Sequence, residues 1–171
     1  MVTITATEGW IDALPHSRMV YPEGILDRMK YWFWRVYGPI HPLIRNTSTA
    51  LGFDAGFFGE SLDENGRQDF LIGTLHPERT LRDFAMYLVE NGFANHFVAW
   101  KDSGEVISLR KTVGFHYQYH IRVFGDGEVR CHYEYTPEYR PLQHLLSIGL
   151  EDRREEFRNL MQEWVVPIET A

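Results

Sequence analysis

Apolar residues recur every three or four positions in three stretches of the chain, the spacing of a helix that buries one face. The first predicted helix begins at Pro22, and Gly38-Pro39 predicts its end because proline disfavours helical backbone in the residue before it. The second runs from Pro77 to Asn91-Gly92, with Thr80 and Asp83 placed for a capping box, and the third covers about residues 150–164. Their apolar stripes are Ile25, Met29, Trp32, Phe33 and Val36, then Leu81, Phe84, Ala85, Leu88 and Val89, then Leu150, Phe157, Leu160, Met161 and Trp164.

A period of two replaces the helical period between the second and third helices, and it predicts a meander of short strands. Turn residues at Asp102-Ser103-Gly104 and Gly125-Asp126-Gly127 join the first pair and the last pair of these strands. The predicted strands cover residues 96–101, 105–113, 116–124 and 128–135.

Asn65-Gly66 predicts a further hairpin, over residues 57–62 and 67–75, because both central positions of a type I′ turn require positive φ. Helices and strands are segregated along the chain rather than alternating. The fold class is therefore predicted as α+β, with a mostly antiparallel sheet packed by about three helices. We expect one domain over residues 1–171, with an irregular segment at about 38–56 that is rich in proline and glycine.

The register of the last hairpin decides which of its side chains share a face. A three-residue loop with Gly127 in the left-handed conformation pairs Ile121 with Cys131 and His120 with His132, and only this register separates polar from apolar positions. One face then holds Tyr117, Tyr119, Ile121, Val123, Val129, Cys131, Tyr133 and Tyr135, and the other holds His116, Gln118, His120, Arg122, Arg130, His132 and Glu134.

Three side chains on the polar face form the candidate site. His120 and His132 lie opposite one another, and Glu134 stands two residues beyond His132 on the same side. Two imidazoles and a carboxylate on rigid strands can bind a divalent metal ion, or His120 and Glu134 can act as a general acid and base. His116 is about 13 Å from His120 along the strand, too far to share an ion.

The same face has two other interpretations. Polar residues commonly occupy the solvated side of an antiparallel sheet, and Arg122 opposite Arg130 would repel a nearby cation. These arginines, with His116 and Gln118, are instead candidates for binding an anionic ligand such as a carboxylate or phosphate.

Composition narrows the function classes. The 24 acidic and 17 basic residues of this 171-residue chain give a net charge of −7, which disfavours binding to the nucleic-acid backbone. Cys131 is the single cysteine, so no intrachain disulfide can form, and we predict a buried thiol. No secretory signal or membrane span is recognised, and we expect a cytoplasmic protein that does not associate with membranes.

The leading functional hypothesis is a small domain that binds a small molecule or a protein partner, without a catalytic signature. The alternative is a hydrolase or lyase that uses His120, His132 and Glu134, with or without a divalent metal. A second alternative is a nucleic-acid accessory protein with a Tyr/Arg sheet face. The aromatic stretch Tyr31–Tyr37 is predicted as a buried core helix, with homo-oligomerisation through this helix as the alternative.

Overall fold

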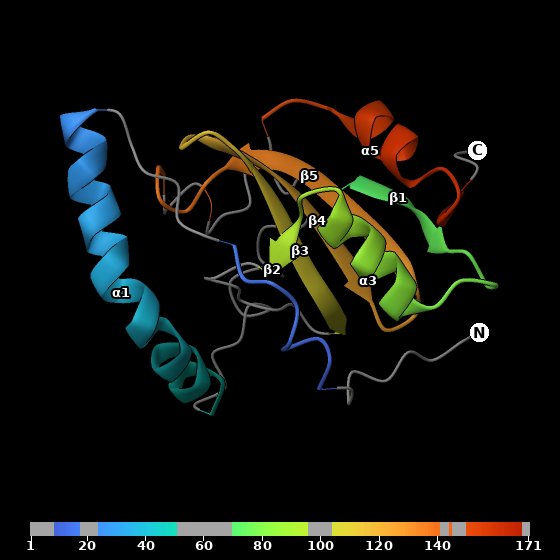
Figure 1. The fold of residues 1–171 in the computed structure, drawn as a ribbon, viewed down its shortest axis with the longest axis horizontal. Helices are drawn as coiled ribbons and strands as arrows, with labels where there is room; N and C mark the ends of the chain where they lie inside the picture. Colours follow the sequence, from blue (N-terminus) through green and yellow to red (C-terminus); the bar gives the residue numbers. More distant parts are fainter. Residues whose placement is uncertain are drawn as a thin grey trace.

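The computed structural model describes residues 9–17, 24–50, 70–95, 104–140, 144 and 150–168. Its strands form a six-stranded antiparallel sheet of order β2-β3-β4-β5-β1-β6, and helices pack against it, so the predicted α+β class is confirmed (Figure 1). The elements are α1 (Ile25–Ala50), β1 (Phe70–Leu75), α3 (Leu81–Glu90), β2 (Ala94–Asn95), β3 (Glu105–Val113), β4 (Tyr117–Phe124), β5 (Glu128–Tyr135), α5 (Arg154–Met161) and β6 (Val165–Pro167).

The meander occupies one side of the sheet, where β2, β3, β4 and β5 are neighbours in chain order. The strands predicted over 105–113, 116–124 and 128–135 are confirmed with small changes at their ends. The strand predicted at 96–101 and the turn at Asn65-Gly66 lie outside the described residues. β1 pairs with β5, and β6 pairs with β1 at the far edge of the sheet.

The hairpin of β4 and β5 has the predicted register. Ile121 pairs with Cys131 and His120 with His132, and Gly127 has a φ of 92°. A residue with a side chain rarely adopts this conformation. The separation of the two faces and this left-handed glycine select the same pairing.

The hydrophobic core lies between one face of the sheet and the helices α3 and α5. Leu109, Ile121 and Cys131 form one row across β3, β4 and β5, and each is fully buried. At the start of α3, the Thr80 hydroxyl accepts a hydrogen bond from the Asp83 backbone N–H, as the capping pattern predicts. The ring of Trp164 completes the core beside α3.

The first helix is longer than predicted. α1 continues through Gly38-Pro39 to Ala50 and takes up the part of the predicted irregular segment that the structure describes, so the predicted end at residue 38 is wrong. Pro39 removes one backbone donor, whereas the apolar repeat continues on the same side of the helix at Ile40 and Leu43. The two prolines of α1, Pro39 and Pro42, therefore do not end this helix.

The prediction that α1 is a core helix is also wrong. Trp34 is buried at 6% exposure, but its neighbours Trp32 and Phe33 are 57% and 58% exposed. In Figure 1, α1 stands beside the sheet rather than across either face. None of the described helices combines the length and apolar character that a membrane span requires.

Candidate metal centre

The central part of the polar face of β3, β4 and β5 is buried, so the interpretation as a solvated face is wrong there. Gln118 and Glu134 have 0% exposure, and His132 has 2%. Part of the cover comes from the chain after β5, since Glu138 and His144 contact residues of this face. A charged or polar group that loses its water requires partners inside the protein, and the contacts of this face show what those partners are.

The three predicted side chains lie together. His120 Nδ1 is 3.3 Å from His132 Nε2 and 3.2 Å from Glu134 Oε1, and His132 Nε2 is 3.1 Å from Glu134 Oε2. One donor atom from each residue lies within 4.8 Å of the other two. We call these three residues the His/Glu cluster.

For either carboxylate oxygen of Glu134, two of these separations are close to those around a tetrahedral metal ion. Ligand atoms about 2.0–2.1 Å from one zinc ion lie roughly 3.3 Å from each other when the angles are tetrahedral. In the His/Glu cluster, the two imidazole nitrogens are 3.3 Å apart, and each of them lies 3.1 or 3.2 Å from a different carboxylate oxygen of Glu134. The cluster therefore brings donor atoms of three residues into the range of one divalent ion.

Glu134 is at the centre of this arrangement. Besides its contact with His132, its Oε2 lies 3.0 Å from His144 Nδ1, yet among the described residues this buried oxygen accepts no hydrogen bond of good geometry. Oε1 is held more firmly, because Gln118 Nε2 donates to it at 2.6 Å. One carboxylate oxygen is thus oriented by the protein, and the other faces imidazole nitrogens.

The pKa of Glu134 shows that its charge is retained. Burial alone raises the pKa of this carboxyl, but the charges of His144 and His132 and the contact with His120 outweigh burial and hold it well below its usual range. A general acid needs a pKa near the operating pH. Glu134 therefore serves as an anionic ligand or anchor better than as a proton carrier.

His120 is held neutral and oriented. Burial lowers its pKa, the nearby His132 and His144 lower it further, and Glu134 acts in the opposite direction. Its Nε2 lies 2.8 Å from the Ser108 hydroxyl, which leaves Nδ1 toward the cluster. Metal-binding histidines usually have their second nitrogen fixed in this way.

A buried ion pair is connected to the His/Glu cluster through hydrogen bonds. Arg110 makes a two-pronged contact with Glu138, at 2.8 and 3.0 Å, and donates to Gln118 Oε1 at 3.0 Å. Gln118 in turn donates to Glu134, so four side chains form a chain of hydrogen bonds. Such contacts set the orientation of a ligand and the basicity of its donor atoms.

The arginines predicted to bind an anionic ligand have internal partners. Arg122 pairs with Glu105 at 3.0 Å, where both side chains are buried, and Arg130 pairs with Glu128 at 2.7 Å. Each positive charge is balanced by an adjacent carboxylate. The repulsion of a cation expected from Arg122 opposite Arg130 is therefore reduced.

His116, also predicted to contribute to binding, lies elsewhere. It precedes β4 and is 46% exposed, and its Nε2 is 3.3 Å from Asp27 of α1. Its ring packs edge-on against Tyr139. The structure thus separates His116 from the His/Glu cluster, as the distance along the strand predicts.

Several supporting residues were not among the predicted site residues. Ser108 and Arg110 lie on β3 and join the polar face through the pairs Ser108–Arg122 and Arg110–His120. Extending the alternation of polar and apolar positions from the hairpin to β3 would have found them. Glu138 and His144 follow the last strand, where no period of two or 3.6 indicates the side of the sheet on which they lie.

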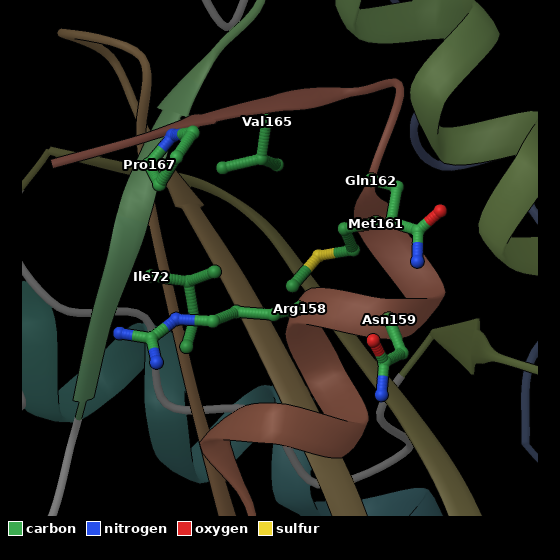
Figure 2. Close-up of a pocket in the computed structure, with 7 residues that line it drawn as sticks. All are labelled: Ile72, Arg158, Asn159, Met161, Gln162, Val165 and Pro167. Carbon is green, nitrogen blue, oxygen red and sulfur yellow. The ribbon is translucent and has the colours of Figure 1, made fainter.

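A separate cavity of about 220 Å³ lies between α5 and the strands β1 and β6. Figure 2 shows Met161 and Arg158 reaching from α5 toward Ile72 of β1. Arg158 already pairs with Glu155 at 2.6 Å, and no residue of the His/Glu cluster lines this cavity.

Comparison with known proteins yields no relative: no family model, curated protein or solved structure matches this chain.

Proposed function

We propose that this protein binds a divalent transition-metal ion, best fitted by zinc, through His120, His132 and Glu134. The gathering of donor atoms carries the proposal, because one atom from each of the three residues lies within 4.8 Å of the others. The separation of 3.3 Å between His120 Nδ1 and His132 Nε2 is that of two ligands of a tetrahedral zinc ion. Two imidazoles and one carboxylate suit zinc better than calcium or magnesium, which prefer oxygen ligands.

The ion is proposed as a bound ligand rather than as a catalyst. A catalytic metal must keep a position open to substrate, whereas the side chains of His132 and Glu134 are 2% and 1% exposed and that of His120 is 12% exposed. The ion would bridge β4 and β5. This proposal keeps ligand binding, the leading hypothesis from the sequence, and takes the ligand to be a metal ion at the site predicted from the hairpin.

A proton can also hold such a cluster together, since His120 and His132 are close enough for a hydrogen bond. The experiment must therefore detect the ion itself. We expect the chelator-treated protein to take up one equivalent of Zn²⁺ in calorimetric titration. Co²⁺ in its place should give the visible absorption of a four- or five-coordinate N/O site.

Variants locate the bound ion. His120→Ala and Glu134→Gln should each weaken zinc binding by at least about 100-fold, because each removes a direct ligand, a larger change than the loss of an outer hydrogen bond. His116→Ala is the matched control, since it removes a nearby imidazole outside the cluster. Circular dichroism establishes that each variant is folded. Failure of the folded wild-type protein to bind zinc or cobalt, or equal loss in the control, would refute the proposal.

A further inference from the structure

The longest of the described helices, α1, carries a wide row of exposed apolar side chains. Nine large hydrophobic side chains of α1 are 38% to 78% exposed. At 3.6 residues per turn they lie within an arc of about 120°. We call this surface the α1 arc; its members are Ile25, Leu26, Met29, Trp32, Phe33, Val36, Ile40, Leu43 and Ile44.

The opposite side of α1 contacts residues that flank the strands β4 and β5. Asp27 lies 3.3 Å from His116, Lys30 stands over the ring of Tyr139, and Trp34 is buried. Asp27 and Trp34 are seven residues apart and project about 160° and about 140°, respectively, from the middle of the α1 arc. The helix is therefore held by one face while the other remains exposed.

The spacing within the α1 arc indicates what covers it. Ile25, Met29, Trp32 and Val36 follow one another at intervals of four, three and four residues, and Leu43 comes seven residues after Val36. This is the repeat by which one helix packs against another along a common axis. A second apolar row at intervals of seven, Leu26, Phe33 and Ile40, widens the contact.

We infer that the α1 arc is a self-association surface that pairs with α1 of a second copy of this chain. The nine side chains expose roughly 1,000 Å², given about 150–250 Å² for a large side chain, and a specific interface needs about 800 Å² per partner. The arc contains no charged residue, so two identical copies meet without repulsion, as a two-fold interface requires. A net charge of −7 disfavours an anionic membrane as the occupant.

Sedimentation of the full chain, from micromolar concentrations to about 1 mM, tests this inference. We expect a monomer–dimer equilibrium, with the dissociation constant raised at least about tenfold in Met29→Glu and in Val36→Glu, because each would bury an unpaired carboxylate. Met86→Glu is the matched control: Met86 is 43% exposed but lies on α3, and its substitution should leave association unchanged. These positions are exposed, so melting temperatures should stay near that of the wild type.

Three results would overturn the inference: a monomer at every concentration, a dimer that persists unchanged in both α1 variants, or loss of the dimer in Met86→Glu to the same extent. Binding of the monomer to vesicles of phosphatidylcholine and phosphatidylserine, abolished by Met29→Glu, would assign the arc to a membrane surface and equally refute self-association. None of these outcomes depends on metal binding.

Discussion

The residues of the His/Glu cluster are common residue types, and their protonation states depend on being buried next to one another. An exposed histidine near a glutamate titrates close to its usual value. In this protein, burial lowers the pKa of His120, while the surrounding imidazoles keep the pKa of Glu134 low despite burial. The folded protein therefore holds a neutral donor beside an anionic one at neutral pH, which is the protonation state that metal binding needs.

The pKa of His120 predicts how the metal-free protein responds to acid. Because this pKa is lower in the folded than in the unfolded state, the unfolded chain binds the proton first, and stability is lost as pH falls below about 6.5. The slope is at most about 1.4 kcal/mol per pH unit for one proton. Glu134 adds a second loss only below its unfolded pKa of about 4.5, because its folded pKa is also depressed.

Urea denaturation between pH 7.5 and 5.5, with chelator present, measures this effect. We expect His120→Gln to flatten the dependence of the unfolding free energy on pH, since glutamine does not titrate. Identical slopes in the wild type and His120→Gln would contradict the assignment of the pH dependence to His120.

Among the elements, β6 depends on a close backbone approach at the edge of the sheet. A Cβ atom on Gly73 would lie 2.1 Å from the carbonyl oxygen of Val166, far inside contact distance. Gly73→Ala must therefore push β6 away from β1 or shift both strands, and we expect a loss of about 1–3 kcal/mol in unfolding free energy. Gly9→Ala is the control, because no atom of the described residues beyond its chain neighbours lies within 4 Å of the position of its Cβ; an equal loss there would contradict the steric explanation.

The elements also show which features could be predicted from the sequence. The register of β4 and β5 was predictable because strand alternation and the turn at Gly127 impose independent conditions that only one pairing satisfies. The end of α1 was not predictable, because Pro39 indicates that the helix stops whereas the apolar repeat at Ile40 and Leu43 indicates that it continues. Local sequence rules do not tell which of these two signals is stronger. Burial of α1 was also mispredicted, since periodicity identifies the apolar side of a helix but not what covers it.

At the scale of the whole molecule, the sheet separates two environments. The side beneath α3 and α5 is an apolar core, while the opposite side is a buried polar layer in which Arg110, Arg122 and Glu134 each have partners of complementary charge or polarity. Glu138 and His144 reach this layer from outside the strands, so the hairpin sequence alone suggested a solvated face. The burial of the predicted site is thus a property of the complete fold.

This arrangement predicts that zinc stabilises the whole molecule. A ligand that binds only the folded state at 100 times its dissociation constant adds about 2.7 kcal/mol, or roughly 5–10 °C in melting temperature for a domain of this size. We expect such a rise for the wild type in calorimetry and its reversal by chelator. Met29→Glu should retain the rise, because the α1 arc lies outside the cluster.

His132→Ala distinguishes binding at the cluster from binding elsewhere. This variant removes a ligand that is 2% exposed, so its metal-free form should melt below the wild type, and zinc should not restore the difference. A rise equal to that of the wild type would place the ion at another site and contradict the proposed one. Because the shift measures preference for the folded state, it also excludes an ion held equally well by histidines of the unfolded chain.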